Sequence, residues 1–366
     1  MPVQYESIVS EHRATRQAAG LFDVSHMGRL LVEGPTALEW LEGLLTRRVA
    51  DLAVVRARYT LVTGIDLGAD DGADPVILDD ALVTRLADSV DGTPRLLLVV
   101  NASNRLRVVR WLESQLPAAC VAFTDQTEST AMIAVQGPLV LAEAAGVLQD
   151  VWPGDLVAML AGLPVYGAVE TRLAGVPAII SRTGYTGEDG IELVIDAAAA
   201  MPLWERLLAA GQDRGVRPCG LGSRDTLRLE AGMPLYGHEL TEATDPSAIG
   251  LGRAVDLAGR TFPGAAELAA RRAAGGRLRV GLRFDSKRAA RQGDTVLSPE
   301  TGEACGLVTS GSFSPSCDCG IAMAMVEPAA AAEGTQLAAV VRGSQLPARV
   351  VPLPFYRRPR ETVSRS

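Results

Sequence analysis

The spacing of hydrophobic residues changes along this chain, and the change falls near residue 277. Before it, short alternating runs are followed by segments with apolar residues three and four apart, as when residues 29–33 precede Leu38, Leu41 and Leu45. Alternation predicts a half-buried strand, and the second spacing predicts an amphipathic helix. We therefore expect strands mixed with helices over this first part of the chain.

The same reasoning predicts further elements before residue 277. The strands that we expect lie at residues 57–63, 76–84, 95–100, 131–135, 176–180 and 191–195. The helices that we expect lie at residues 7–20, 36–45, 104–116, 139–147 and 223–232. Ser223 is a suitable cap for the last of these helices, and Gly232 is a suitable stop.

From residue 277 onward the pattern is one of short strands alone. They lie at residues 278–284, 295–297, 306–308, 320–326, 337–341 and 346–351, separated by Gly, Pro and Ser. This spacing is typical of a small β-barrel or sandwich. An Ala- and Arg-rich stretch at residues 265–276 is the expected linker. At ~150 residues per domain, 366 residues predict two or three domains.

Charge and hydropathy exclude some classes of binding partner. The chain has 35 basic and 43 acidic residues, which give a net charge of −8. Because it has no overall basic field, we expect no binding to nucleic acid or to an anionic membrane surface. Its longest apolar run, residues 96–100, is far shorter than the ~20 residues that span a bilayer.

Cysteine and histidine are both scarce. An odd, scattered set of cysteines indicates reduced thiols and therefore a cytoplasmic protein. These cysteines are Cys120, Cys219, Cys305, Cys317 and Cys319. With only three histidines, we expect neither a His-rich metal site nor a Ser-His-Asp triad.

The densest candidate for chemistry is a glycine-rich stretch, residues 181–190, between two expected strands. Tyr185 offers an aromatic face for stacking. Glu192, in the strand that follows, points to the face opposite Ile191 and Leu193. Its carboxylate suits two parallel N–H donors, such as those of an amino-pyrimidinone edge. On this motif alone, a hairpin loop that simply needs glycine is the favoured alternative.

Two other candidates are charged. Arg224 falls in the first turn of an expected helix, where the helix dipole disfavours a cation, and its planar fork suits a carboxylate or carbonyl ligand. The alternative is a surface ion pair with Asp225 or Glu230. Asp79 and Asp80 are adjacent on an expected strand, so at most one of them addresses a given site. By themselves they are typical of a solvated strand end.

Taken together and in order, several motifs resemble the aminomethyltransferase family, the T-protein of the glycine cleavage system. They extend from about residue 5 to residue 356. The matching pieces are Gly20-Leu-Phe-Asp-Val-Ser-His-Met-Gly28, Leu78-Asp-Asp80, Val99-Val-Asn-Ala102, Ala134-Val-Gln-Gly-Pro138, Arg182-Thr-Gly-Tyr-Thr-Gly-Glu-Asp-Gly-Ile-Glu192, Gly222-Ser-Arg-Asp-Thr-Leu-Arg-Leu-Glu-Ala-Gly232, Leu235-Tyr-Gly237 and Val308-Thr-Ser-Gly-Ser-Phe-Ser-Pro315.

The resemblance implies a fold and a division into lobes. The implied fold class is α+β, with three lobes around a central hole that holds tetrahydrofolate. The first lobe is discontinuous and consists of residues 1–50 plus 130–255. The second lobe, residues 51–129, is inserted into it. The third is a C-terminal β-barrel domain, residues 277–356.

The resemblance also implies a reaction. The family takes an aminomethyl group from the lipoyl arm of the H-protein, within the glycine cleavage system, and gives 5,10-methylenetetrahydrofolate and ammonia. Tetrahydrofolate is the co-substrate, and no metal is needed. Carried over by motif, Asp80 is the catalytic residue and meets the reactive amine edge of the folate. The residues that hold the folate by the same carry-over are Tyr59, Tyr185, Glu192, Arg224 and Tyr356.

Some stretches depart from the family pattern. Residues 64–75 are longer and more acidic than the family's usual turn, Arg47-Arg48 replaces Asn-Asp, and Arg253 stands where Trp is usual. A folate-dependent demethylase of the same fold is therefore the main rival. A non-catalytic folate-binding protein of the iron–sulfur repair type is a weaker one, since its signature cysteine is missing here. The folate domain of an oxidase is weaker still, because the chain has no dinucleotide fingerprint.

Overall fold

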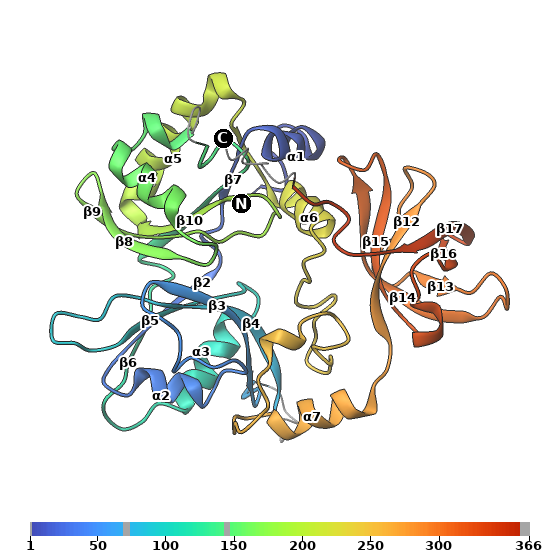
Figure 1. The fold of residues 1–366 in the computed structure, drawn as a ribbon, viewed down its shortest axis with the longest axis horizontal. Coiled ribbons are helices and arrows are strands. Elements are labelled where there is room, and N and C mark those ends of the chain that lie inside the picture. Colours follow the sequence, from blue (N-terminus) through green and yellow to red (C-terminus); the bar gives the residue numbers. More distant parts are fainter. Residues whose placement is uncertain (1, 69–73, 143–146, 359–366) are drawn as a thin grey trace, which may run out of the picture.

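The computed structural model describes residues 2–68, 74–142 and 147–358 of the chain. Three β-sheets lie at three corners of the molecule, two of them open and the third closed into a barrel (Figure 1). Helix α6 (Leu221–Glu230) lies between the six-stranded sheet and the barrel, and helix α7 (Ala265–Ala274) leads into the barrel. The fold is therefore α+β with a C-terminal barrel, as expected.

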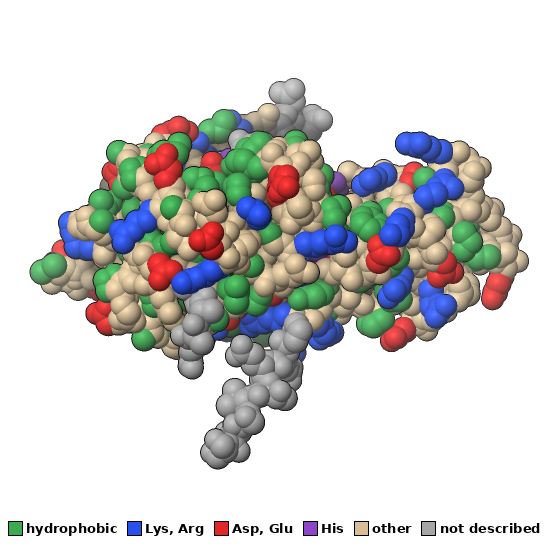
Figure 2. Space-filling model, turned by 90° about the horizontal axis from the view of Figure 1, so that it is seen from above, with side chains coloured by type: hydrophobic (Ala, Val, Ile, Leu, Met, Phe, Trp, Pro, Cys, Tyr) green, Lys and Arg blue, Asp and Glu red, His purple; other side chains and the backbone are tan. Residues whose placement is uncertain are grey.

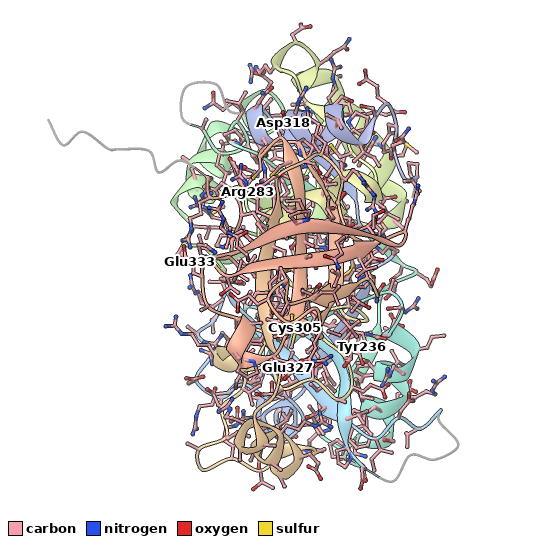
Figure 3. All side chains as sticks on the ribbon, turned by 90° about the vertical axis from the view of Figure 1, so that its right-hand side faces the viewer. Tyr236, Arg283, Cys305, Asp318, Glu327 and Glu333 are labelled. Carbon is pink, nitrogen blue, oxygen red and sulfur yellow. The ribbon has the colours of Figure 1, made fainter. Side chains whose placement is uncertain are left out.

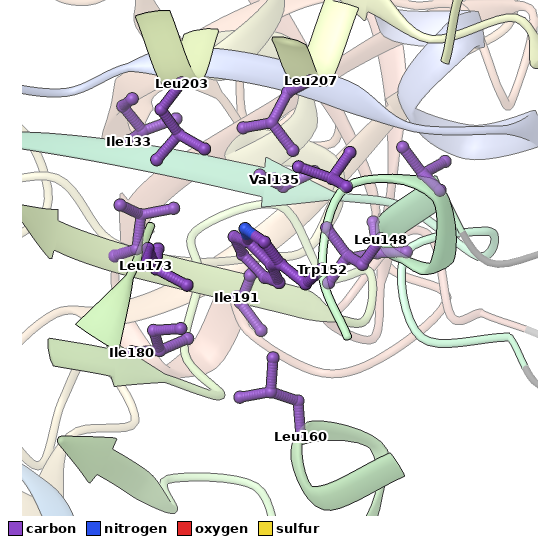
Figure 4. Close-up of a cluster of buried hydrophobic side chains, with 14 of the residues drawn as sticks. Ile133, Val135, Leu148, Trp152, Leu160, Leu173, Ile180, Ile191, Leu203 and Leu207 are labelled. Atoms are coloured by element: carbon purple, nitrogen blue, oxygen red, sulfur yellow. The ribbon is translucent and has the colours of Figure 1, made fainter. Parts of the chain in front are cut away.

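The six-stranded sheet has the strand order β11-β1-β7-β10-β9-β8. Its strands are β1 (Gly20–Asp23), β7 (Thr130–Gln136), β8 (Ala168–Leu173), β9 (Val176–Ser181), β10 (Gly190–Asp196) and β11 (Arg217–Pro218). Helices α4 (Gly154–Gly162) and α5 (Ala197–Gly211) pack on it around the buried indole of Trp152 (Figure 4). Because side chains alternate along β10, Ile191 and Leu193 enter this core while Glu192 faces away from it.

The five-stranded sheet has the order β3-β4-β5-β2-β6. Its strands are β2 (Gly28–Glu33), β3 (Arg56–Gly64), β4 (Val76–Arg85), β5 (Arg95–Val100) and β6 (Ala122–Asp125). Helices α2 (Ala37–Glu42) and α3 (Arg105–Ser114) pack on it through residues such as Leu41 and Trp111. Strand β2 pairs with β5 and β6, so the chain passes from one sheet to the other before residue 28, ahead of the expected lobe boundary at residue 50.

Arg29 ties the two open sheets together where the chain passes between them. Its buried guanidinium donates hydrogen bonds of 2.5–3.0 Å to the backbone oxygens of Ser25, Met27, Thr127 and Thr130. Carbonyl oxygens on both crossing segments thus satisfy a charge that is costly to bury alone. This arrangement fixes the separation of the sheets, and therefore of the side chains that they present to each other.

The C-terminal barrel has the strand order β12-β15-β14-β13-β16-β17. Its strands are β12 (Leu278–Phe284), β13 (Thr295–Leu297), β14 (Ala304–Ser314), β15 (Cys319–Val326), β16 (Gln336–Val341) and β17 (Ser344–Val351). All six expected strands are present, and β14 is longer than residues 306–308. Cys305 and Asp318 mark opposite ends of the β14–β15 hairpin (Figure 3). The expected linker, residues 265–276, is largely helix α7.

Helix α1 (Ile8–Gln17) is capped by the Ser7 side chain, which accepts from the Ser10 N–H, but two other helix predictions are wrong in detail. Residues 139–142 form a turn and a bend instead of a helix, residues 143–146 lie outside the described residues, and a 3-10 helix follows at Val147–Asp150. Helix α6 begins at Leu221, so Ser223 lies inside it and donates to the Gly220 oxygen at 2.9 Å.

Acidic and basic side chains are interspersed on the face shown in Figure 2. No helix among the described residues is both long enough and apolar enough to cross a membrane. Within the same ranges, no group of three or more His, Cys, Asp or Glu side chains is placed to hold a metal ion. The five cysteines are all free thiols.

Candidate active site

A pocket of about 130 Å³ lies between the two open sheets, and we call it the inter-sheet pocket. Helix α6 and residues 234–236 complete its wall. Five of the residues that the sequence singled out line it, although they come from four separate parts of the chain. They are Tyr59, Asp80, Tyr185, Glu192 and Arg224.

Asp80 faces the pocket, and its neighbour Asp79 supports it from behind. The Asn101 side-chain amide donates to both carboxylates, at 2.8 Å each. Asp79 also accepts from the Asn101 backbone N–H at 2.7 Å and from Asn104 at 2.6 Å, at the N-terminus of α3. The Tyr59 hydroxyl donates to Asp80 at 3.0 Å. Asp80 is thus the member of the pair that can meet a ligand.

Neither aspartate has a cation partner among the described residues; Asp79 is fully buried, and Asp80 is half-buried at the pocket. Burial raises the pKa of Asp80 above its ordinary value, and the hydrogen bonds from Tyr59 and Asn101 only partly offset this. Burial, followed by the nearby Asp80 charge, also raises the pKa of Asp79. The pair therefore holds a proton more readily than free aspartates do, which is typical of functional carboxyl groups.

Glu192 provides the second carboxylate of the pocket, from strand β10 of the other sheet. It is 8% exposed, and its Oε2 accepts from the Thr183 hydroxyl at 2.6 Å. Among the described residues, its Oε1 has no hydrogen-bond donor. Glu192 therefore retains acceptor capacity that a ligand with N–H groups would satisfy.

Tyr185 and Arg224 form a stacked pair in the same wall. The Arg224 guanidinium lies 4.9 Å from the centre of the Tyr185 ring, and the Tyr185 hydroxyl donates to the Pro234 oxygen at 2.5 Å. Arg224 Nη1 is buried without a hydrogen-bond partner among the described residues. Burial lowers the pKa of Arg224 and raises that of Tyr185. An unsatisfied buried donor of this kind is rare and points to a missing ligand atom.

The glycines of residues 181–190 serve the loop itself. A Cβ on Gly184 would lie 1.9 Å from the Gln136 side-chain oxygen, and Gly187 has a φ of +81°. The same Gln136 side chain donates to the Thr183 and Ile191 backbone oxygens. Glycine therefore builds the hairpin, as the first interpretation has it, and Tyr185 and Glu192 line the pocket, while their binding of a ligand stays a prediction.

Comparisons with known proteins fit this geometry. The family model described as the GCVT N-terminal domain matches residues 1–259, and that of the glycine cleavage T-protein C-terminal barrel domain matches residues 277–357. The chain belongs to this family. It is 44% identical to an aminomethyltransferase of Streptomyces avermitilis and 42% identical to one of Symbiobacterium thermophilum, over 98% of this chain and 92% of each relative.

The fold agrees with that of a solved T-protein. The glycine cleavage system aminomethyltransferase T of Bartonella henselae superposes with a TM-score of 0.84 at 34% identity, covering 98% of this chain and 92% of that one. The resemblance seen in the sequence is thereby confirmed, as are the enzyme class and the barrel. The assignment of individual site residues stays a prediction.

Tyr356 differs from the other T-protein site residues carried over from the sequence. It is not among the residues that line the inter-sheet pocket. Its ring lies against Arg16, with the guanidinium 3.9 Å from the ring centre, and its backbone N–H donates to the Glu230 oxygen at 2.9 Å. The structure thus places Tyr356 between α1 and the C-terminal end of α6.

Sequence reasoning missed several residues of this T-protein pocket, among them Asn101 and Tyr236. Both stood inside matching motifs, but neither was assigned a role. Asn101 follows strand β5 and reaches both aspartates of β4. Tyr236 donates to the Ile77 oxygen at 2.6 Å and joins the 234–236 segment to β4. Asn101 could have been predicted, because it is a polar residue that directly follows a buried strand.

Proposed function

We propose that the inter-sheet pocket binds the pterin ring of tetrahydrofolate and that the chain transfers an aminomethyl group to it from the lipoyl arm of an H-protein. The observation that carries the proposal is one pocket holding two carboxylates, Asp80 and Glu192, neither of which forms an ion pair with a described residue. Anionic acceptors left open in this way match a ligand rich in N–H donors. Family membership supplies the aminomethyl donor.

The residues present fit such a ring. Glu192 has the open acceptor for the amino-pyrimidinone edge, and Tyr185 has the flat face. The orphaned Arg224 Nη1 has the donor for a ring carbonyl oxygen. Asp80 stands on the opposite sheet, where it accepts from the reactive nitrogen at the other end of the ring. Positioning of this kind needs no metal and no protein nucleophile.

The reaction balances without a redox partner. Two C–N bonds to the folate form, while the C–S bond to the lipoyl arm and the C–N bond to ammonia break. Two protons move from the folate nitrogens to the leaving sulfur and the leaving ammonia. Asp80, with its raised pKa, is placed to hold one of these protons and to stabilise the developing positive charge.

A coupled assay tests this function. The protein is mixed with tetrahydrofolate and aminomethylated H-protein, and ammonia and 5,10-methylenetetrahydrofolate are followed together. We expect the two products in equal amounts. Folate binding by calorimetry without ammonia release would contradict the proposal and favour the demethylase or the non-catalytic binding protein.

Glu192→Gln tests the pterin contact separately. The substitution places an amide donor opposite a donor edge, so we expect tetrahydrofolate affinity to fall about tenfold or more. Glu205→Gln, at an exposed position of α5, is the matched control and should bind normally. Calorimetry measures both variants, and an unchanged affinity in Glu192→Gln would place the pterin edge elsewhere.

A further inference from the structure

Two of the five cysteines stand two positions apart in the barrel, and the reaction proposed above uses neither of them. Cys317 lies in the turn of the β14–β15 hairpin, and Cys319 is the first residue of β15. Only Asp318 separates them, near the end of the barrel that this residue marks in Figure 3. Because a disulfide needs two sulfurs close together, this pair is a candidate for redox chemistry.

The two thiols lie in one seam, between the barrel and helix α6. Alternate residues of β15 enter the barrel core, whereas Cys319 belongs to the outward set, which packs with Leu229 of α6. Cys317 packs on the same apolar cluster, and its Sγ lies 3.9 Å from the Phe355 oxygen. Both side chains are therefore on the same side of the hairpin.

The backbone between the two cysteines is contracted. Asp318 has a φ of +50°, and Ser314 pairs with Cys319 across the hairpin, so residues 315–318 form a tight turn. Even in a fully extended chain, Cα atoms two positions apart are separated by only about 7 Å. A left-handed residue between them shortens this separation. Disulfides join cysteines whose Cα atoms lie ~4.4–6.8 Å apart, so the backbone permits one here.

The two thiols differ in access. Cys317 is half-buried, so a small oxidant can reach it, whereas Cys319 is only 8% exposed. Burial raises the pKa of the Cys319 thiol, and the Arg283 guanidinium, which forms a hydrogen bond with it, opposes this rise. An accessible thiol that reacts first and a neighbouring thiol that resolves the product are the two parts of a redox pair.

The turn that carries this pair also holds the barrel on α6. The Cys317 N–H donates to the Ser314 Oγ at 3.0 Å, and this Oγ donates to Glu230 at 2.5 Å. Ser316 donates to Glu230 through its N–H at 3.0 Å and its Oγ at 2.7 Å. Glu230 is the last residue of α6, the helix that carries Arg224. A change in the turn therefore acts directly on the contact between barrel and helix.

We propose that Cys317 and Cys319 form a reversible disulfide when the protein meets a peroxide, and that this bond loosens the barrel from α6. The Cys317 sulfur attacks one oxygen of hydrogen peroxide. The O–O bond breaks, the sulfur is oxidised to a sulfenic acid, and the other oxygen leaves as water with the thiol proton. The Cys319 sulfur then displaces the hydroxyl group, so that an S–S bond forms, the S–O bond breaks and a second water leaves with the Cys319 proton.

Two thiols and one peroxide thus give a disulfide and two waters, and a dithiol reductant restores both thiols by exchange. The loop that this bond closes is very short, so it constrains the unfolded chain little. Drawing Cys317 toward Cys319 disturbs the hydrogen bonds that Ser314 and Ser316 make, so we expect the oxidised protein to be less stable. The inference goes beyond the proposed function and does not depend on it.

Thiol counting after mild oxidation tests the inference. The full chain is treated with an equimolar amount of hydrogen peroxide and then with catalase, free thiols are counted in urea, and tandem mass spectrometry locates any disulfide. Cys317→Ser removes the thiol that reacts first, and Cys317→Ala does so without adding a hydroxyl group. Cys120→Ser removes an exposed thiol elsewhere and is the matched control. Urea unfolding is measured before oxidation, after oxidation and after dithiothreitol.

We expect the wild type and Cys120→Ser each to lose two thiols per chain and to contain the Cys317–Cys319 bond. Both should unfold at a lower urea midpoint after oxidation, and dithiothreitol should restore the thiols and the midpoint. Cys317→Ser and Cys317→Ala should form no disulfide within the chain and should keep their midpoints.

Other results would overturn the inference. A disulfide between other cysteines, or a sulfenic acid at Cys317 that persists without a bond, would exclude the pairing. Formation of the bond with an unchanged or higher midpoint would exclude the loosening of the barrel. An equal fall in midpoint in Cys317→Ala would assign the effect to another oxidised group, such as a methionine.

Discussion

Two clusters of acidic side chains in this molecule differ in whether cations compensate their charge. The first, which we call the interlobe cluster, joins α1 and α6 to the end of β14. There Glu230 accepts from Arg16 at 3.0 Å, lies 3.1 Å from His12 Nε2, and accepts from the hydroxyls of Ser314 and Ser316. Burial alone raises the pKa of Glu230, but these partners lower it to about 2.

The second cluster is the pair of aspartates at the inter-sheet pocket. Asp80 is half-buried and opens on the pocket, whereas Glu230 is fully buried, yet Asp80 receives only a tyrosine hydroxyl and an amide, and its pKa is raised. Burying a charge without a cation costs free energy that a structural site avoids. The difference separates a carboxylate that holds lobes together from one whose partner, under the proposed function, is a ligand.

Glu230→Gln is the strongest test of the structural half of this comparison. It leaves Arg16 buried with only Glu188 as an anionic partner, so we expect the free energy of unfolding to fall by about 3–5 kcal/mol. Asp318→Asn removes the exposed Lys287–Asp318 pair and should cost less than about 1 kcal/mol. Urea unfolding compares the two, and equal losses would contradict the distinction.

Asp80→Asn tests the functional half. The amide keeps the shape and can still accept from Asn101 through its oxygen, while its nitrogen donates to the Tyr59 hydroxyl, but it cannot hold the proton, so we expect turnover to fall by about 10²–10³. Stability should stay the same or rise, because a buried charge without a cation is removed. Asp79→Asn, one residue away and outside the pocket lining, should lose less activity. Wild-type turnover in Asp80→Asn, in the coupled assay, would end its catalytic assignment.

The two clusters also predict opposite slopes of stability against pH. Between pH 2 and 4.5 the unfolded chain binds the proton of Glu230 more readily than the folded chain does, so stability falls as the pH drops through this range. For Asp79 and Asp80 the folded chain binds the proton more readily, so stability falls as the pH rises above 3.8. Each slope is at most about 1.4 kcal/mol per pH unit.

Variants separate these two slopes. Urea unfolding over a range of pH should show a flattened acid limb in Glu230→Gln and a flattened upper limb in Asp79→Asn. A curve for Glu230→Gln that runs parallel to that of the wild type below pH 4.5 would contradict the role given to Glu230.

The contrast also explains how much of the fold the sequence could predict. Barrel strands and the alternation of β10 depend on neighbouring residues, so their positions followed from local pattern. The segment at 139–142 looked helical because it is apolar, but Gly137 with a φ of +145° and the packing of residues 139–140 hold it as a turn. Local pattern carries no information about such contacts.

The candidate site shows the same limit. Asp80, Glu192 and Tyr185 lay in motifs and were predicted, yet Asn101 reaches the aspartates only because β4 and β5 are paired in one register. The interlobe cluster depends on His12 and Glu230, which are 218 positions apart in the chain. The sequence alone could not predict this cluster, because it forms only where α1, α6 and the barrel pack against one another.

Tyr356→Phe gives the smallest expected effect. It tests whether Tyr356 belongs to the interlobe cluster or to the inter-sheet pocket. The ring packs on Arg16 in the interlobe cluster, beside Glu188 and Glu230, and a phenyl ring keeps this packing. We therefore expect tetrahydrofolate affinity to change by less than about twofold and stability by less than about 1 kcal/mol. Calorimetry and urea unfolding measure both. A loss of folate affinity as large as that of Glu192→Gln would return Tyr356 to the pocket and show that the ends of α1 and α6 move when folate binds.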